Sequence, residues 1–332
     1  GVIGHEFAGE IADLGAETRA EGLLAVGDLV TAEGHVICGH CVPCRTGNGH
    51  LCVRTSIIGV DRDGAFAEYI AMPASNVMHL DGIPTETGAI MDPIGNAVHT
   101  ALEHIDFAAW AVPLAEVPAA QIQVLARVLQ ADGFTAPAAR DAAAHLLSAA
   151  LRTPLLGDTC LAALLPAQRR AELQFHFGMA GADPQALLQL LHAHGYQSHR
   201  NAFAHVGTRL AGLMNGLIDL VFVHEARWWV VDYKTNFLGE HAGDYALERL
   251  PMVIAQNDYD LQYLIYTVAL HRWLRQVRGA DYDYERDFGG VRYLFLRGMG
   301  VGDPGNGIFV DRPPAKLILA MDELLHAPGM TP

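Results

Sequence analysis

The stretch GLIDLVFVHEARWWVVDYK, residues 216–234, decides how the second half of this chain folds. It contains two runs rich in apolar, β-branched and aromatic residues, from Gly216 to His224 and from Arg227 to Lys234. Only Glu225 and Ala226 separate the runs, and two strand-like runs joined by two residues predict a β-hairpin. We therefore expect two neighbouring antiparallel strands here.

Three charged side chains of this hairpin suggest a site for phosphodiester hydrolysis. Asp219 and Asp232 lie on the two expected strands, so their carboxylates can converge on one divalent cation. Lys234 follows Asp232 by two residues, and on a strand it points to the same face. Oxygen ligands bind Mg²⁺ or Mn²⁺, the cation activates water, and the lysine stabilises charge on the scissile phosphate. The alternative is that both aspartates end ordinary strands beside a solvated lysine, because Asp-x-Lys alone is a weak motif.

The sequence around the hairpin predicts an α/β region preceded by helices. A helix is expected from about Asp260 to Gln276, followed by a β-like run from Val291 to Arg297 and a C-terminal helix. The Ala/Leu-rich segment from about Ala108 to Gln174 repeats its apolar residues at spacings of three and four, which is typical of amphipathic helices.

Two of the expected helix faces offer further polar groups. Gln262 and Tyr266 are four residues apart on the helix after the hairpin, and so face one side. His99 and Glu103 have the same spacing on an earlier helix. A lone histidine on such a helix is more often structural, but together with the two aspartates these residues form a candidate set.

Four of the five cysteines lie close together near the N-terminus. Their pattern is C-x2-C-x2-C-x7-C, and four thiolates at these spacings can surround one tetrahedral zinc ion. A redox-active CxxC pair and unlinked thiols are the alternatives. An odd number of cysteines in a long chain without a visible secretory signal favours a metal site over a disulfide framework. We therefore predict structural zinc, bound by Cys38, Cys41, Cys44 and Cys52.

Composition restricts the class of protein. The chain has 332 residues, of which 51% are hydrophobic and 18% charged, and a net charge of −15. These values exclude a disordered tail, a collagen and a coiled coil, and the acidic balance disfavours a generic nucleic-acid coat. No apolar run reaches the roughly 18 residues of a membrane helix, so we expect a soluble, cytoplasmic protein. No signal peptide is visible, and the start at Gly1 suggests a fragment or a processed start.

Residues 1 to about 102 resemble zinc-dependent medium-chain dehydrogenases of the threonine 3-dehydrogenase family. The resemblance rests on GHEFAGE (4–10), the Gly27-Asp28 turn, EGH (33–35), the four-cysteine lobe and DPIGNAVHTAL (92–102). It implies a partial, mostly-β GroES-like domain with a zinc lobe. It also implies a catalytic zinc held by His5, Glu6 and Asp92 together with an upstream cysteine, which this chain lacks.

The nucleotide-binding half that hydride transfer needs is not evident in the sequence. No strand followed by a glycine-rich turn and a helix occurs after Leu102. The one literal GxGxxG, at Gly300, Gly302 and Gly305, contains Pro304 and lacks a βαβ context, so we interpret it as a loop. Dehydrogenase activity is therefore not expected.

From about residue 95 to the end, the chain resembles the C-terminal nuclease domain of RecB-type exonuclease V beta subunits. The most specific stretches are GLIDLVFVHE (216–225), VDYKTNFLG (231–239), YDLQYLIYTVALHR (259–272), DYDYE (281–285) and FGGVRYLFLRG (288–298). The resemblance implies an α/β nuclease domain of the PD-(D/E)xK type that acts on DNA with RecC-like and RecD-like subunits and without a membrane. No GxxxxGK[ST] occurs, so neither a helicase motor nor an ATPase is expected.

The same resemblance implies a set of site residues. Magnesium, or Mn²⁺ or Ca²⁺ in its place, would be bound by His99, Asp219, Asp232 and the carbonyl of Tyr233. Lys234 would be catalytic, and Gln262 and Tyr266 would complete the site.

These observations predict two domains. Residues 1–94 are expected to form a truncated dehydrogenase-like catalytic domain with a zinc lobe. Residues 95–332 are expected to form the nuclease domain, helical over 100–175 and with its α/β catalytic core over 205–300. The leading function is a metal-dependent DNA exonuclease or endonuclease in double-strand break repair; the alternatives are an inactive L-threonine 3-dehydrogenase fragment and a non-catalytic hybrid.

Overall fold

The computed structural model describes residues 1–41, 44, 52–80, 85, 89, 91–196, 210–239 and 241–326, and at residues 91–94, 96 and 180 the backbone only. The chain divides into two compact units. One contains residues 1–97 and 126–143, and the other contains residues 98–125 and 144–332.

The second unit is built around a five-stranded mixed sheet. Its strands are β8 (Arg169–Ala182), β9 (Leu210–His224), β10 (Arg227–Lys234), β11 (Phe288–Phe295) and β12 (Ile308–Asp311). The strand order is β12-β11-β10-β9-β8, with β10 and β11 parallel and the other neighbours antiparallel. All eight residues of β11 are buried, so this strand forms part of the core on both of its faces.

The predicted hairpin is confirmed as β9 and β10. His224 pairs with Arg227, which leaves Glu225 and Ala226 as the turn. Both have positive φ, 49° and 61°, as a type I′ turn requires at its two central positions. The twist of this turn matches that of the strands. The resulting register brings Asp219, in the middle of β9, level with Asp232 near the end of β10.

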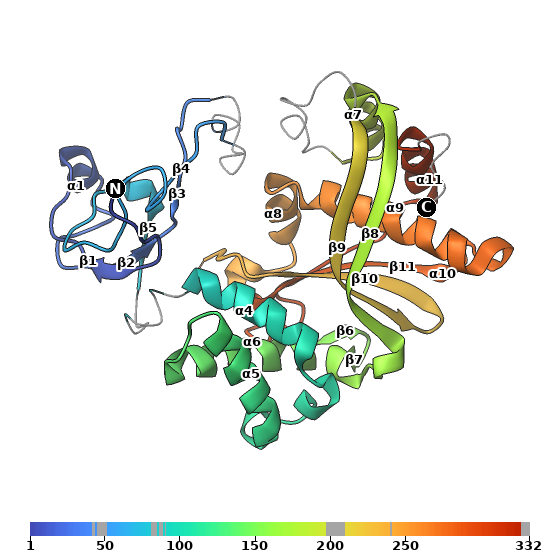
Figure 1. Ribbon diagram of the computed structural model, residues 1–332, viewed down its shortest axis with the longest axis horizontal. Helices are drawn as coiled ribbons and strands as arrows, with labels where there is room; N and C mark the ends of the chain where they lie inside the picture. Colours follow the sequence, from blue (N-terminus) through green and yellow to red (C-terminus); the bar gives the residue numbers. More distant parts are fainter. Residues whose placement is uncertain are drawn as a thin grey trace. The chain divides into compact units, whose positions relative to one another are not determined.

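Helices connect and cover the strands of this sheet. They are α7 (Pro184–Ala193), α8 (Leu250–Gln256), α9 (Tyr259–Arg278), α10 (Tyr284–Asp287) and α11 (Ala315–Leu324). The predicted helix α9 makes the crossover between the parallel strands β10 and β11, and runs across the sheet behind β8 and β9 (Figure 1). In the part of the chain that the structure describes, no helix is long and apolar enough to cross a membrane.

The predicted helical segment over 100–175 is only partly correct. Helices α4 (Met91–His104), α5 (Ala119–Ala131) and α6 (Pro137–Arg152) occur there, but the short pair β6 (Pro154–Leu156) and β7 (Thr159–Cys160) follows, and β8 begins at Arg169. The physical reason is that Leu173, Phe175 and Phe177 alternate at a spacing of two, which is a strand pattern. The core sheet therefore extends beyond 205–300 at both ends. The segment with Gly300, Gly302 and Gly305 lies in turns between β11 and β12, as predicted.

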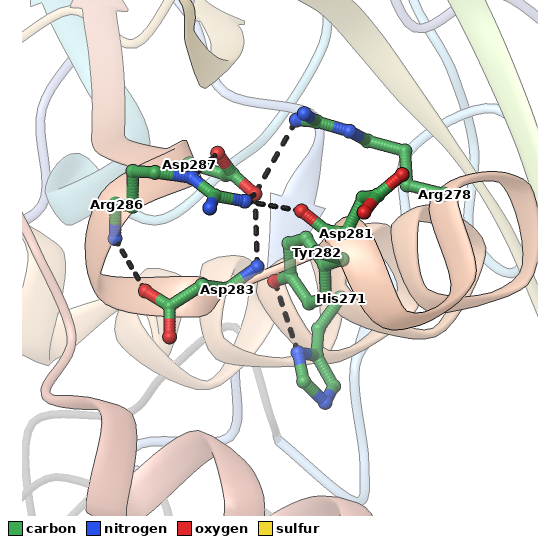
Figure 2. A network of polar contacts seen from close by, with 7 residues as sticks. All are labelled: His271, Arg278, Asp281, Tyr282, Asp283, Arg286 and Asp287. Carbon is green, nitrogen blue, oxygen red and sulfur yellow. Dashed lines mark hydrogen bonds and ion pairs between the residues drawn. The ribbon is translucent and has the colours of Figure 1, made fainter.

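A cluster of charged residues joins the end of α9 to the start of β11 (Figure 2). Asp287 lies at its centre and accepts hydrogen bonds from Nε and Nη2 of Arg286 at 2.7 and 2.8 Å, while Arg278 Nη1 lies 3.3 Å from Asp287 Oδ2. Asp283 caps α10 by accepting from the Arg286 N–H, and its own N–H donates to Asp287. The cluster therefore fixes the connection through which α9 is held against the sheet.

The first unit contains two small antiparallel sheets. One has the order β1-β2-β5, and the other pairs β3 with β4. The elements are β1 (Ala8–Glu10), α1 (Ala16–Glu21), β2 (Leu29–Ala32), β3 (His35–Val36), β4 (Ser56–Ile57) and β5 (Val77–His79). Large apolar side chains such as Val60, Phe66 and Tyr69 are exposed. Over residues 1–79 the described part of this unit carries five strands and the six-residue helix α1, as expected for a mostly-β domain; residues 126–143 of the unit belong to α5 and α6.

Candidate nuclease site

Asp219 and Asp232 lie on neighbouring strands at the end of the hairpin. The last printed pair of the ladder joins Val231 to Leu220, so the next step of the same register places Asp232 level with Asp219. Only 3% of the Asp232 side chain and 17% of the Asp219 side chain are exposed. Asp219 Oδ2 accepts a hydrogen bond of 2.8 Å from the backbone N–H of Tyr233, which fixes this carboxylate to β10.

Lys234 lies at the centre of the polar contacts. Its Nζ is 2.6 Å from Asp232 Oδ2 and donates a hydrogen bond of 3.0 Å to Gln262 Oε1. The ammonium also lies 4.0 Å from the centre of the Tyr259 ring. The Asp232 carboxylate, the Gln262 amide and the Tyr259 ring therefore restrict the position of the Lys234 ammonium.

Gln262 and Tyr266 continue this chain of contacts along α9. Gln262 Nε2 donates to the hydroxyl of Tyr266 at 2.8 Å, and its Oε1 accepts a second hydrogen bond, of 3.0 Å, from the hydroxyl of Tyr293 on β11. Because the amide oxygen accepts from both Lys234 and Tyr293, the orientation of the Gln262 amide is fixed.

Helix α4 brings His99 to the same end of the hairpin. Its Nδ1 lies 3.5 Å from Asp219 Oδ2, and its ring meets the Tyr233 ring edge-on with centroids 5.8 Å apart. The backbone of Tyr233 favours the protonated form of His99 and so slightly opposes the lowering of its pKa by burial. The predicted ligands thus gather in one place, but the ligating atoms of His99, Asp219 and Asp232 do not all lie within 4.8 Å of one another; among the described residues, only the four cysteines do.

Burial controls the protonation of the site. It raises the pKa of Asp232 to about 7 and that of Asp219 to about 6, against the opposing effect of the Lys234 ammonium. Burial also lowers the pKa of His99. A carboxylate pKa that rises and a histidine pKa that falls both mean that charged forms are poorly solvated here. Such groups are enriched at functional sites.

The sequence did not single out three residues that the structure brings to this site. Glu172 lies on β8 between the pairs Ala171–Leu220 and Leu173–Ile218, level with Asp219, and its charge raises the pKa of Asp219 further. Tyr293 is the parallel-sheet neighbour of Asp232. Tyr259 lies one turn before Gln262 on α9. The i, i+3 spacing could have indicated Tyr259, but Glu172 and Tyr293 needed the strand order.

The donor set fits a divalent cation that prefers oxygen. It offers two carboxylates and one imidazole, to which the expected carbonyl of Tyr233 would add a third oxygen ligand. Asp232 Oδ2 is buried and lies 2.6 Å from the ammonium of Lys234, which offsets part of its charge. Burial still raises the pKa of Asp232, so the ionised carboxylate is incompletely stabilised, and a bound cation would stabilise it further.

The four cysteines form a separate cluster in the first unit. Cys41 Sγ lies 3.4 Å from Cys44 Sγ and 3.9 Å from Cys52 Sγ, and Cys38 Sγ lies 3.9 Å from Cys44 Sγ. All four are free thiols. Backbone N–H groups of Cys38 and Arg54 donate to Cys52 Sγ and lower its pKa to about 6. Four converging sulfurs, one of them poised as a thiolate, fit a tetrahedral zinc ion.

The ligands expected for a dehydrogenase catalytic zinc, His5, Glu6 and Asp92, are brought together less completely than the four cysteines. His5 Nε2 lies 3.5 Å from Glu6 Oε1, and both side chains are exposed. The side chain of Asp92 lies outside the described residues. Within the described part, the structure therefore pairs His5 with Glu6 and brings no third predicted ligand to them.

A mixed sheet with a hairpin that carries Asp, Asp-x-Lys and a supporting glutamine defines a nuclease fold. The profile of the PD-(D/E)XK nuclease superfamily matches residues 76–324, about three quarters of the chain, and the chain belongs to this superfamily. The alcohol dehydrogenase GroES-like domain matches residues 1–82. Both parts of the predicted fold are thereby confirmed.

Individual relatives match either the nuclease part or the dehydrogenase-like part of the chain. The RecBCD enzyme subunit RecB of Escherichia coli (strain K12) is 50% identical over 123 residues, which are 37% of this chain and 10% of that protein. The L-threonine 3-dehydrogenase of Shewanella woodyi is 53% identical over 102 residues, 30% of this chain and 29% of that protein. Among solved structures, galactitol-1-phosphate dehydrogenase from Escherichia coli is 36% identical, with a TM-score of 0.26, over 31% of this chain and 29% of that chain. The matches thus span about a tenth of the RecB relative and less than a third of the dehydrogenases.

Proposed function

We propose that this chain hydrolyses DNA phosphodiester bonds with Mg²⁺ or Mn²⁺, as the nuclease domain of a RecB-like protein. The observation that carries the proposal is the arrangement of Asp219, Asp232 and Lys234. The buried Asp232 and the partly buried Asp219 lie level on one hairpin, and an ammonium lies 2.6 Å from Asp232. Membership of the nuclease superfamily and the similarity to RecB support it.

Each residue has a distinct part in this proposal. His99, Asp219, Asp232 and the carbonyl of Tyr233 would hold the cation, which when bound lowers the pKa of a water ligand and offsets phosphate charge. Lys234 would stabilise the negative charge that develops on the phosphate. Gln262 accepts a hydrogen bond from Lys234 and orients it, and Tyr266 in turn orients Gln262.

The setting of this activity is also a proposal. RecB is a subunit of the RecBCD enzyme, so RecC-like and RecD-like proteins are the partners we expect for this chain. DNA repair in the cytoplasm follows from the same relationship. We further propose that residues 1–94 and 95–332 are separate domains and that the first holds one structural zinc ion on Cys38, Cys41, Cys44 and Cys52.

The test is degradation of linear DNA at low salt, because the acidic net charge predicts weak binding to DNA. Degradation with Mg²⁺ or Mn²⁺ that stops with a chelator, and that is lost in Asp219→Ala, supports the proposal. Intact DNA at high protein concentration with either cation contradicts it. Threonine-dependent NADH formation by the same sample would support the dehydrogenase alternative instead.

A further inference from the structure

A pocket of about 260 Å³ lies between β8 and α9. Its walls include Phe175 and Phe177 from β8 and Ala269 and Trp273 from α9. This volume is below the roughly 300–1,000 Å³ of pockets for drug-sized ligands. The pocket therefore suits a single flat ring system.

The walls offer aromatic faces on which such a ring can stack. Phe175 and Phe177 are nearly parallel, with centroids 6.0 Å apart and 21° between their planes. Gly216 lies opposite Phe175 on β9, and a Cβ there would be 2.6 Å from the tip of the ring, so only glycine lets the ring lie over the strand. Trp273 is supported edge-on by Trp228 at 5.2 Å. Phe175 and Trp273 are only half-buried, so both keep surface available to a ligand.

The polar groups at the pocket suit hydrogen bonding more than the binding of an anion. The guanidinium carbon of Arg272 lies over the Phe177 ring, 4.4 Å from its centroid, and its charge is paired with the buried carboxylate of Asp322. The remaining polar lining consists of exposed neutral amides and an imidazole, contributed by Gln174, His176 and Gln276. Aromatic faces with donors and acceptors at the edge match the chemistry of a nucleobase.

A short series of side-chain contacts links the pocket to the nuclease site. The Phe175 ring lies 5.8 Å from the ring of Tyr266, whose hydroxyl accepts a hydrogen bond from Gln262. Gln262 in turn accepts from Lys234. The residues Gln262, Tyr266, Ala269 and Trp273 are spaced by four, three and four positions, so one face of α9 leads from the lysine to the pocket.

We propose that this pocket binds one unpaired nucleobase of the DNA strand whose phosphate lies at Asp219 and Asp232. The inference rests on the proposed nuclease function and adds a subsite to it. Stacking of a base on aromatic side chains contributes about 1–3 kcal/mol, which corresponds to roughly 5- to 150-fold in affinity. A base that is paired in a duplex cannot enter the pocket, so the subsite selects unpaired nucleotides.

The first experiment needs no variant. Single-stranded oligonucleotides carrying one abasic nucleotide are cleaved by the complete chain with Mg²⁺, and every cleavage position is mapped. The expected result is that the bond at one fixed distance from the abasic nucleotide is cut about 5- to 150-fold more slowly than in the unmodified strand. Cleavage that does not depend on the abasic position overturns the subsite but leaves the nuclease function intact.

The second experiment measures binding and so separates the subsite from catalysis. The fluorescence anisotropy of a labelled oligonucleotide is compared for the parent chain, Trp273→Leu and the control Leu217→Ala. Leu217 is a suitable control because its side chain is 47% exposed and it precedes the pocket residue Ile218 on β9 without lining the pocket. Weaker binding in Trp273→Leu alone supports the subsite, even if no DNA is cut and the proposed function fails. Equal binding by all three proteins overturns it, as does a Trp273-dependent affinity for an apolar peptide instead of the oligonucleotide.

Discussion

The four-cysteine unit and the nuclease sheet are stabilised in different ways. In the first unit the strands have two to four residues, and Phe66 and Tyr69 are each 72% exposed. In the second unit β11 is buried over its whole length, and α9 and α11 contribute to one continuous apolar core. Burial of apolar area is the main favourable term in folding. We therefore expect the nuclease sheet to fold without a metal and the cysteine lobe to depend on one.

The largest effect that tests this comparison is loss of zinc from the first unit. Replacing Cys41 and Cys44 together with serine removes two of four ligands, and structural zinc sites contribute on the order of 10 kcal/mol of binding free energy. We expect about one zinc ion per chain in the parent and none in the variant, with faster proteolysis confined to residues 1–94. Metal analysis and limited proteolysis measure this, with Cys160→Ser as the control outside the cluster. Cleavage that begins in the nuclease unit would contradict the comparison.

The next effect concerns catalysis in the second unit. Lys234→Ala is expected to lower turnover by about 10²–10³-fold with little change in Mg²⁺ affinity, because the ammonium acts on charge that develops at the phosphate. Lys234→Arg is not expected to restore full activity, since a planar guanidinium does not replace a compact ammonium. Lys316→Ala is the matched control, because Lys316 on α11 is the chain's other lysine. A parent-like rate for Lys234→Ala would remove the lysine from the site.

The third effect concerns Asp219, whose ionised carboxylate is expected to support nuclease activity but to lower folding stability. The folded-state pKa of Asp219 is raised to about 6, above the value of about 3.9 in an unfolded chain. The carboxylate therefore costs stability above pH 6, up to about 3 kcal/mol, and this cost disappears as the pH falls towards 4. Asp219→Asn keeps an oxygen that can accept from Tyr233, so we expect a higher melting temperature at pH 8 without metal, but no nuclease activity.

Melting of both proteins with and without Mg²⁺ checks this expectation. The parent should gain stability on adding Mg²⁺, because the cation offsets the buried charge, and Asp219→Asn should gain less. A variant that is less stable than the parent at pH 8 without metal would show that Asp219 is adequately solvated as an anion.

The smallest effect concerns a carboxylate whose charge is satisfied. Asp287 is paired with Arg286 and Arg278, and these contacts lower its pKa to about 2 (Figure 2). Its ionised form therefore contributes stability above pH 4, about 2 kcal/mol, which is lost as the pH falls from about 4 to 2. Asp287→Asn should lose this amount at pH 7 in urea unfolding, and the exposed Asp303→Asn should not. Equal midpoints for both variants would contradict the role of the charged cluster.

Local patterns were enough to predict much of the fold. The two-residue turn predicted the hairpin of β9 and β10, and the helix expected from about Asp260 to Gln276 is α9. By contrast, β8 was missed because its alternating Leu173, Phe175 and Phe177 follow directly on an alanine-rich helical region. Strand order is a long-range property, so the parallel pairing of β10 with β11 could not be predicted from either segment alone.

The residues of the candidate site also separate into those that local spacing predicted and those that depend on long-range packing. Asp232 and Lys234 share a strand, and Gln262 and Tyr266 share a helix face, so their spacing predicted which of them would lie together. Glu172 and Tyr293 reach the site only through the neighbouring strands, and no local spacing indicates them. The contact of Gln262 with Lys234 likewise depends on how α9 packs against the sheet.

The most direct test of the central claim is a comparison of DNA degradation by three proteins: the parent chain, Asp232→Ala, and the double variant Cys41→Ser/Cys44→Ser. All three are assayed on linear DNA at low salt with Mg²⁺. The nuclease site lies wholly in the second unit, so we predict that the cysteine variant degrades DNA at close to the parent rate and that Asp232→Ala does not degrade it. Degradation by Asp232→Ala at the parent rate, or loss of activity in the cysteine variant alone, would contradict this account.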